Sequence, residues 1–569
     1  MIIKMKNIFK SITIILVFVF ASCDLDGDLT NPNQISVAGA DVDLIMNAVQ
    51  LSFADFYNSA SANVDQLVRM QAMTGGFRYQ TAIQPVSVDN LWTQAYRNVL
   101  VNAEALIPLA QSKNLTTHVA VAKIIEAYVY LTLVDVFGDV PQAEAVSGAS
   151  GNFNPVADKG DVVYAKAISL LTEARTELAK TGAAAGAALA RDIYYSGNRT
   201  RWAALANTLE LKAWMNIRTV AARRGEADGK ITALLTTDLI DTEAENFTYK
   251  YGTATVPAGS RHPLYDQYYG PSRGQAGGYI NNGYLYKCFG KWDAADPLNF
   301  TKAVQDPRWR YYFYRQIGSN AQGLVVDPKS LGCSPGAAPA VYQAGGFVFC
   351  QFDPGFYGRD HGDASGTPPD SPVITCAGAY PAGGKIDNTS TAQTSFATAT
   401  IRGDGENGAG FQPIWMSFFT DYIKAEIRAN AGDNAGAKTL LATAIANSVA
   451  QVKKSAKTTA NQLSAGREPL IAPYQAAVAT SFDNAARKLD VIADEYYIAL
   501  WGNGVEAYNL YRRTLAPKGL QPTIGDGGPY FRSLVYPAVY ANLNSNAVQK
   551  DVTKINKVFW DVNPDNAIN

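Results

Sequence analysis

The chain has 569 residues, of which 47% are hydrophobic and 17% are charged. This is the composition of a folded globular protein and excludes wholesale disorder. The 49 Lys and Arg residues nearly balance the 50 Asp and Glu residues, which excludes the strongly basic surface of a nucleic-acid-binding protein. The 3 His and 5 Cys residues leave little material for a zinc site, whereas 31 Tyr, 23 Phe and 8 Trp make the chain rich in aromatic rings.

Residues 1–22 have the parts of a secretory signal peptide. Lys4, Lys6 and Lys10 form a basic start. The apolar run 12–20 that follows is shorter than the ~20 residues of a membrane-spanning helix. Residues 20–23 read Phe-Ala-Ser-Cys, which resembles a bacterial lipobox. The resemblance implies cleavage before Cys23 and lipidation of this cysteine, and an ordinary signal peptide cleaved near Ala21 is the alternative.

Residues 23–39 are expected to form an anchor linker. Asp24, Asp26 and Asp28 follow the cysteine and resemble the signal that sends such lipoproteins to the cell surface, although a solvated linker would also be acidic. Two or three acyl chains anchor a protein stably, whereas one chain does so only marginally. The expected location is therefore the outer membrane, with a lipid anchor and the protein facing the cell exterior.

Residues 40–250 show helical periodicity and are expected to form an N-terminal helical part. Asp41 is a candidate helix cap, and further helices are expected over 91–106, 119–137, 162–178 and 202–220. The stretch 119–137 is apolar on nearly every side, which predicts a helix buried inside a larger body. Gly138 and Pro141 are placed to end this helix.

Residues 251–410 are rich in Gly, Pro, Tyr and Asn, and helical periodicity fades there. They are expected to form long ordered loops with short strands, and long loops inside a compact protein are usually functional. Four cysteines lie in this part: Cys288, Cys333, Cys350 and Cys376. Export permits disulfides, but four cysteines allow three pairings, and buried thiols are the alternative.

Residues 411–569 are expected to form a C-terminal helical part. Helices are predicted from about residue 413, with Trp415 and Phe419 on one face, and over 436–452, 484–501 and 505–511. Glu506 is expected to form a structural ion pair with Arg512 or Arg513. The predicted fold class is mostly α, a tetratricopeptide-like scaffold of helix pairs with a loop-rich, irregular binding region, although no clean 34-residue repeat is present.

Two motifs resemble catalytic signatures without the context that catalysis needs. Residues 270–274 match G-x-S-x-G, but no strand–turn–helix pattern surrounds them. Residues 359–363 read RDHGD, where a metal or acid–base site competes with a network that rigidifies a loop. The network is the favoured interpretation, because one histidine beside two carboxylates is a weak signal for chemistry.

Several stretches together resemble the SusD/RagB family of surface nutrient-binding lipoproteins. Residues 91–98 read LWTQAYRN, and residues 135–141 end a helix with DVFGDVP. Residues 358–363 read GRDHGD, and residues 502–508 read GNGVEAY. With the lipobox, these stretches follow the order of the family over nearly the whole chain. They are interpreted as markers of the fold, because their side chains favour packing and structural hydrogen bonds.

The resemblance implies a non-catalytic receptor with no catalytic residues. Such proteins cap a SusC-like TonB-dependent outer-membrane transporter, capture an oligosaccharide and help deliver it into the barrel. A peptide ligand in the same role, a surface glycosidase or esterase, and a purely structural lid are the alternatives. No nucleic acid and no cofactor are expected. Structural calcium among the loop carboxylates is the alternative, although no spaced set of calcium ligands appears there.

Sugar rings stack on aromatic side chains, and their hydroxyls need amide, carboxylate or guanidinium partners. Loops rich in Tyr, Trp, Asn, Asp and Arg supply both. The candidate ligand-binding residues are Phe77, Arg78, Tyr79, Trp92, Tyr265, Tyr268, Tyr269, Tyr279, Tyr284 and Trp292. For each ring, packing or contact with the transporter is the alternative.

Overall fold

The computed structural model describes residues 41–257, 259–269, 278–289, 304–317, 337–349, 358–364, 373–388, 405–468 and 470–565. Helices dominate this part of the chain, as the sequence predicts. The N-terminal helices are α2 (Val42–Asp65), α3 (Tyr79–Ala82), α4 (Asp89–Thr93), α5 (Val101–Ser112), α6 (Thr116–Phe137), α7 (Gly160–Ala179), α8 (Arg199–Ile217) and α9 (Arg224–Leu234). The middle of the chain holds the shorter helices α10 (Pro263–Tyr269), α11 (Asn282–Phe289), α12 (Trp309–Tyr312) and α13 (Ala340–Gly345). The C-terminal helices are α14 (Ser417–Asn430), α15 (Asn434–Lys453), α16 (Ile471–Asn484), α17 (Lys488–Ala499), α18 (Gly504–Thr514) and α19 (Ala538–Ala541).

Four short strands form two separate antiparallel pairs. They are β1 (Phe247–Lys250), β2 (Phe313–Ile317), β3 (Val373–Ala377) and β4 (Phe411–Trp415). In the first pair Lys250 lies opposite Phe411, and in the second Phe313 lies opposite Ala377. The β1–β4 pair joins the end of the N-terminal helical part to the beginning of the C-terminal one.

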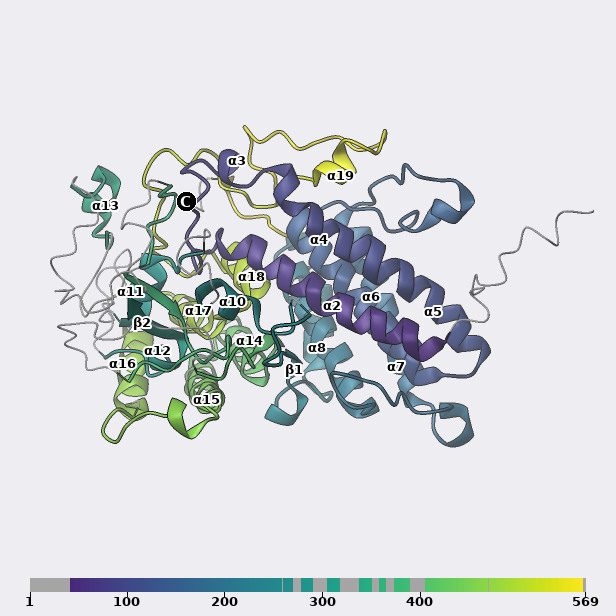
Figure 1. Cartoon of the computed structure of the whole chain (residues 1–569), viewed down its shortest axis with the longest axis horizontal. Coiled ribbons are helices and arrows are strands. Elements are labelled where there is room, and N and C mark those ends of the chain that lie inside the picture. The colour runs from purple at the N-terminus through teal and green to yellow at the C-terminus, as the bar shows by residue number, and fades with distance from the viewer. Residues whose placement is uncertain are drawn as a thin grey trace, which may run out of the picture.

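The helices pack in neighbouring pairs that divide the molecule into two regions (Figure 1). The helices α2 and α4 to α8 lie together on the right in Figure 1, whereas α10 to α12 and α14 to α17 lie to the left. The pairs α6 with α7, α7 with α8, and α14 with α15 are in close contact. The short connection between α14 and α15 makes these two helices antiparallel neighbours, as in a helical hairpin.

Local sequence signals explain where several helices begin and end. The Asp41 carboxylate accepts a hydrogen bond from the Asp43 backbone N–H at 2.9 Å, which confirms the predicted cap of α2. The buried helix α6 ends at Gly138, whose φ of 82° suits a residue without a side chain. The prediction that Trp415 opens a helix is wrong, because it ends β4 and α14 begins at Ser417. Helix α16 was not predicted from the sequence.

A buried carboxylate on α6 ties the N-terminal and C-terminal helices together. Asp135 accepts hydrogen bonds from Lys212 Nζ on α8 at 2.6 Å and from Asn509 Nδ2 on α18 at 2.8 Å. The Tyr164 hydroxyl on α7 and the Trp560 indole N–H, at 3.1 Å, also donate to it. Four donors from four separate segments therefore compensate one buried charge.

The partner of Glu506 differs from the predicted one. Its carboxylate lies 3.4 Å from Lys212 Nζ, so Lys212 bridges two acidic groups. Arg513 pairs with Glu426 instead, and the guanidinium of Arg512 donates to Asn509 and to backbone carbonyls. The expected local pair is replaced by one across helices, because α18 directs Glu506 toward α8.

A second buried network organises the region on the left of Figure 1. The Arg308 guanidinium binds the Asp306 carboxylate at 2.6 Å and the Glu495 carboxylate at 3.2 Å. It also donates to Ser448 on α15, and Tyr474 on α16 donates to Glu495 on α17. This network fixes the segment before α12 against three C-terminal helices.

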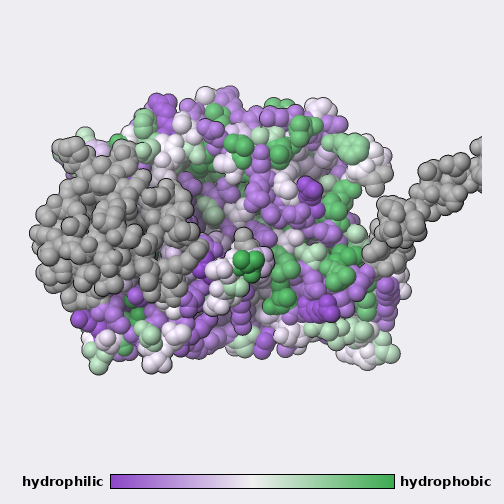
Figure 2. Space-filling view, in the orientation of Figure 1, coloured by the Kyte–Doolittle hydropathy of each residue, from purple (hydrophilic) through white to green (hydrophobic). Residues whose placement is uncertain are grey.

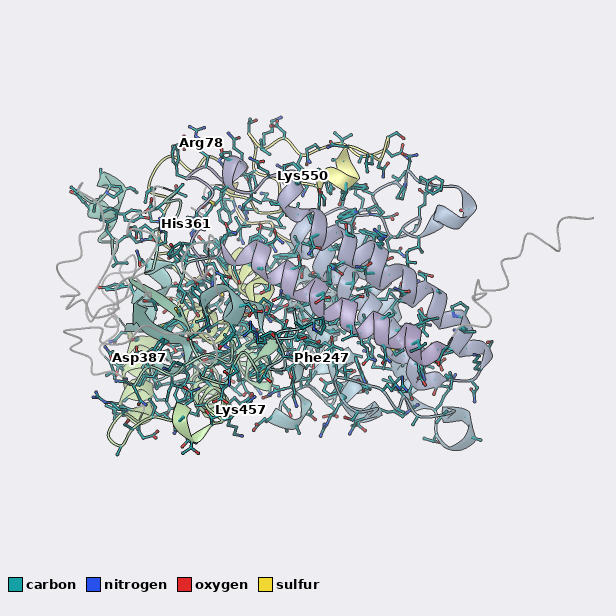
Figure 3. The ribbon with its side chains drawn as sticks, in the orientation of Figure 1. Arg78, Phe247, His361, Asp387, Lys457 and Lys550 are labelled. Atoms are coloured by element: carbon teal, nitrogen blue, oxygen red, sulfur yellow. The ribbon has the colours of Figure 1, made fainter. Side chains whose placement is uncertain are left out.

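Three loops meet around His361, below the loop that carries Phe77 and Arg78 (Figure 3). The Tyr79 hydroxyl accepts a hydrogen bond from Arg69 at 2.8 Å and lies 3.3 Å from His361 Nε2. The His361 backbone carbonyl accepts from Ile524 N–H, and the Gly362 N–H donates to the Met73 carbonyl. Asp360 accepts from Asn282 and Gln521. The RDHGD segment is thus part of a loop-rigidifying network, the favoured interpretation of the motif.

Replacing Lys212 should destabilise the protein strongly. Lys212→Met removes the cation between Asp135 and Glu506 and leaves buried acidic groups uncompensated, which costs about 3–5 kcal/mol. The measurement is the shift of the denaturant midpoint of unfolding. Lys438→Met, which breaks an exposed pair with Asp483, is the control and should cost less than about 1 kcal/mol. Equal effects of the two variants would contradict the central role of Asp135.

Acidification should weaken the fold through buried histidines. Burial lowers the pKa of His262 to about 3 and that of His361 well below its ordinary value. Because an unfolded histidine titrates near 6.5, the unfolded chain binds protons below that pH that the folded chain does not. The carboxyls of Asp65 and Glu126, whose pKa burial raises to about 8, act in the opposite direction over this range.

The pH dependence of stability of the unmodified protein combines these opposite effects. The test therefore compares its unfolding free energy with that of the variant His262→Asn at each pH. The Asn side-chain oxygen can replace Nδ1, which accepts a hydrogen bond from Leu264 N–H at 3.2 Å. The difference in unfolding free energy between the two proteins should fall by about 1.4 kcal/mol for each pH unit below 6.5. If the difference in unfolding free energy between the two proteins stays constant from pH 7 to 4.5, the pKa of His262 is not lowered in the folded protein.

Candidate functional site

The candidate ligand-binding residues divide by their exposure. Seven are buried in this structure: Tyr79, Trp92, Tyr265, Tyr268, Tyr269, Tyr279 and Tyr284. They make packing contacts, such as the stacked pair of Tyr265 and Tyr269 with ring centroids 4.6 Å apart. Trp292 lies outside the described residues. Phe77 and Arg78 remain as exposed residues.

Arg78, at the upper edge of the molecule in Figure 3, lies in a loop that also carries Phe77. The Phe77 side chain is 43% exposed. The Arg78 guanidinium forms an exposed ion pair with Asp526 at 2.9 Å. The buried Tyr79, whose hydroxyl accepts a hydrogen bond from Arg69, fixes the base of this loop. The exposed Phe77 ring and the exposed Arg78 guanidinium are therefore available for contact with a ligand. We call them the Phe77–Arg78 edge.

Trp92 lies in the wall of a cavity of about 720 Å³, called here the aromatic pocket. Its walls come from α4 and the π-helical turn η3 (Gln94–Leu100), from α5, from the segment 141–155, and from α19 with the residues after it. The residues that define it in the following argument are Trp92, Tyr96, Phe153, Tyr540 and Leu543. A volume of this size suits a small-molecule or oligosaccharide ligand.

Stacked rings build the floor of the aromatic pocket. Trp92 lies between Tyr96 and Tyr540, with ring centroids 4.5 Å from each and interplanar angles of 37° and 31°. The Tyr96 hydroxyl donates to the Pro141 carbonyl at 2.8 Å, which fixes its ring. Phe137 meets Trp92 edge-on at 5.5 Å. This arrangement leaves Trp92 only 8% exposed, so most of its surface serves packing.

The Tyr540 hydroxyl is a buried polar group in the wall of the pocket. Among the described residues it has no hydrogen-bond partner. Burial, followed by the nearby Asp158 charge, raises the pKa of Tyr540 to about 12, so the hydroxyl stays protonated at neutral pH. An unsatisfied buried hydroxyl is costly unless a bound molecule or water pairs with it. The group is thus placed to bind a polar ligand atom.

The rim of the aromatic pocket is apolar and exposed, with polar groups beside it. The side chains of Phe153 and Leu543 are 75% and 76% exposed. Arg97, Glu104 and Asn152 also line the cavity. Aromatic faces next to amide, carboxylate and guanidinium groups are the combination that carbohydrate recognition needs.

Sequence reasoning identified Trp92 but not the other rings of this pocket. Tyr96 follows Trp92 by four residues, and this helical spacing was an available signal that the two rings share a face. Phe153 and Tyr540 come from a loop and from a short C-terminal helix. No local pattern in the sequence indicates that these segments meet Trp92.

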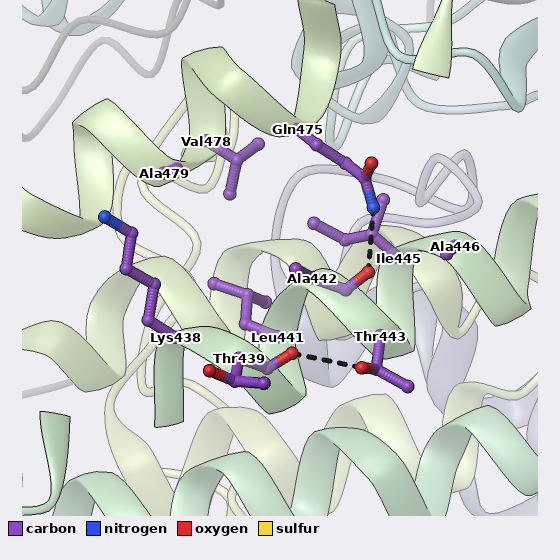
Figure 4. A pocket seen from close by; sticks show the side chains of 10 residues that line it. All are labelled: Lys438, Thr439, Leu441, Ala442, Thr443, Ile445, Ala446, Gln475, Val478 and Ala479. Carbon is purple, nitrogen blue, oxygen red and sulfur yellow. Dashed lines mark hydrogen bonds between the residues drawn. The ribbon is translucent and has the colours of Figure 1, made fainter. Parts of the chain in front are cut away.

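A hollow of about 550 Å³ between α15 and α16 has a different character (Figure 4). Small apolar side chains such as Leu441, Ile445 and Val478 line it, and Gln475 spans it by donating to the Ala442 carbonyl at 2.9 Å. It lacks aromatic rings and has few polar groups. This hollow is a groove between packed helices and is poorly suited to a sugar.

The surface hydropathy, the search for membrane spans and metal ligands, and the cysteines bear on the kind of protein this is. On the face in Figure 2, hydrophobic residues occur in small groups among hydrophilic ones. In the parts of the chain that the structure describes, no helix is long and apolar enough to cross a membrane. Within the same residues, no group of three His, Cys, Asp or Glu side chains is placed to hold a metal ion. Cys288 and Cys376 are buried, and Cys333, Cys350 and the motif at 270–274 lie outside the described residues.

Comparison with solved structures shows proteins of the same fold. A SusD/RagB family protein from Bacteroides thetaiotaomicron matches with a TM-score of 0.60 and 16% identity, over 92% of this chain and 100% of that chain. A chitin-binding SusD homologue from Flavobacterium johnsoniae matches with a TM-score of 0.59 and 18% identity, over 93% of this chain and 99% of that one. A SusD homologue from Bacteroides fragilis gives a TM-score of 0.59 and 16% identity, over 92% and 99%.

No curated protein matches the sequence. A family profile does match: the SusD-like family described as starch-binding and associating with the outer membrane, over residues 32–326. This match spans more than half of the chain and confirms the resemblance seen in the sequence motifs. The chain therefore belongs to the SusD/RagB family of SusD-like proteins that associate with the outer membrane.

Proposed function

We propose that the protein is a non-catalytic receptor that binds a nutrient oligosaccharide at the cell surface. The observation that carries the proposal is the aromatic pocket, where the rings of Trp92 and Tyr540 pack against each other and the Tyr540 hydroxyl has no partner among the described residues. The family description and the chitin-binding structural neighbour support a glycan as the ligand class. The polar groups beside the rings supply partners for sugar hydroxyls.

The receptor would deliver its ligand to a SusC-like TonB-dependent transporter in the outer membrane. This partner follows from the family resemblance. In this role the protein needs no cofactor and no catalytic residue. The exposed Phe77–Arg78 edge lies along the same upper side of the molecule as α19 (Figures 1 and 3). It is the second candidate for contact with the glycan, because one exposed ring there adjoins an exposed cation.

Removing rings at the rim of the aromatic pocket should weaken glycan binding. Phe153 is 75% exposed, and in Phe153→Ser the loss of one stacking ring should lower affinity by about two- to tenfold, since such contacts are worth about 0.5–1.5 kcal/mol. Tyr540→Phe keeps the packing against Trp92 and removes the hydroxyl. Affinity should fall by about three- to tenfold, the typical effect of one hydrogen bond. Calorimetry with a panel of neutral oligosaccharides and peptides measures both.

The matched control is Phe77→Ser, which removes an exposed ring outside the aromatic pocket. If only Phe77→Ser weakens binding, the glycan binds at the Phe77–Arg78 edge. Binding of peptides and not of glycans would favour a peptide receptor in the same role. Hydrolysis of an oligosaccharide during the titration would contradict a non-catalytic function.

Loss of the lipidated cysteine should release the protein from membranes. Cys23→Ala removes the thiol that carries the diacyl group, and a chain without acyl anchors has no comparable membrane affinity. Fractionation of cells followed by immunoblotting measures the distribution, and Ser22→Ala, which keeps a small residue before the cysteine, is the control. Retention of Cys23→Ala in the membrane fraction would contradict the lipid anchor.

A further inference from the structure

A second cavity, of about 770 Å³, lies at the end of the β1–β4 strand pair. We call it the basic cleft and define it by Arg201, Lys250, Tyr251, Phe411, Lys454 and Lys457. Arg201 comes from the first turn of α8, and Lys250 ends β1 opposite Phe411 in β4. Lys454 and Lys457 follow the end of α15. Lys457 lies at the lower edge of the molecule, opposite Arg78 (Figure 3).

The charges around the basic cleft are unbalanced. Four cations and one carboxylate, Glu243, line it, and Glu243 forms an ion pair with Lys454. Among the described residues, Arg201, Lys250 and Lys457 form no ion pair. Three like charges around one concavity repel each other, so an anion bound there is stabilised and relieves the repulsion.

Two of the carboxylates near the cleft, Glu245 and Glu406, are already engaged in hydrogen bonds. Glu245 accepts hydrogen bonds from the backbone N–H and the hydroxyl of Thr242 at 2.9 and 2.7 Å. Glu406 is buried and accepts from the backbone N–H groups of Lys457 and Thr458 at 2.8 and 2.9 Å. These two groups hold the walls of the basic cleft in place. The positive potential at its mouth therefore comes from lysine and arginine side chains held by a fixed backbone.

The basic cleft also offers what a saccharide needs beyond charge. The half-buried rings of Tyr251 and Phe411 line it and can pack against sugar faces. The buried Ser455 hydroxyl also lines it and has no hydrogen-bond partner among the described residues. A concave site with rings, a hydroxyl and several cations favours a small ligand over a flat protein surface.

We propose that the basic cleft is a second binding site, which takes an anionic saccharide carrying carboxylate or sulfate groups. The choice of a saccharide rests on the proposed function, whereas the choice of an anion rests on the charges of the cleft. The site lies apart from the aromatic pocket, which is lined by different elements. The protein would thereby hold a charged glycan at a position distinct from the one that binds a neutral glycan.

The test is calorimetry with the full-length chain purified in detergent, using trigalacturonate, a sulfated disaccharide and neutral galactotriose. Binding of an anionic sugar should weaken by at least about tenfold between 20 and 300 mM NaCl, whereas binding of galactotriose should change little. The double variant Lys250→Gln/Lys457→Gln should lower the anionic affinity by about tenfold or more. The preferred anion, trigalacturonate or the sulfated sugar, shows which charged group the cleft takes.

Lys438→Gln, an exposed lysine on α15 outside the cleft, is the matched control and should leave the affinity unchanged. Ser455→Ala is a second variant that keeps every charge and should weaken binding by about three- to tenfold. An affinity for the anionic sugars that is unaffected by the double variant or by salt would overturn the proposal. So would binding of polyglutamate with no binding of either anionic sugar, because it would indicate an acidic protein partner.

The experiments can reject the aromatic pocket and the basic cleft independently of each other. Phe153→Ser should weaken binding of a neutral glycan and leave trigalacturonate binding unchanged. The double lysine variant should do the reverse. If Phe153→Ser weakens both ligands and the lysine variant neither, the aromatic pocket is retained and the basic cleft is rejected.

Discussion

The Asp135 carboxylate holds together segments that lie far apart in the sequence. It is buried on α6 and accepts donors from Tyr164, Lys212, Asn509 and Trp560. A buried charge with fewer donors would be costly, so each of these segments must be in place for the others to be stable. The N-terminal helices and the C-terminal segment of the chain therefore form one body.

The packed helices around Asp135 support binding sites that are formed partly by loops. The aromatic pocket is built where a loop and the short helix α19 rest against α4 and η3. The basic cleft is built where the β1–β4 pair meets the ends of α8 and α15. Both sites place exposed groups on a base of buried contacts, which keeps the backbone of each site in place. They lie on different elements and can therefore differ in ligand chemistry.

The sequence could predict features that depend on neighbours along the chain. The cap at Asp41, the burial of α6 and its end at Gly138 follow from local periodicity and backbone geometry. It could not predict that Glu506 pairs with Lys212, because the partner lies on another helix and two arginines were nearer in the chain. The same limit applies to the candidate site. Aromatic residues in the loop-rich region look alike in sequence, yet the five candidate tyrosines of this region are all buried.

The sequence by itself determined the helical class, the family and the expected lipid anchor, because periodicity, motif order and the first 23 residues are all read along the chain. Only the tertiary structure decided which aromatic rings are exposed and which cationic side chains line the same cleft. Tyr540 reaches Trp92, and Lys457 reaches Lys250, across more than two hundred residues of sequence. Contacts between residues so far apart in the sequence depend on how the helices pack around a shared core. No local sequence pattern encodes that packing.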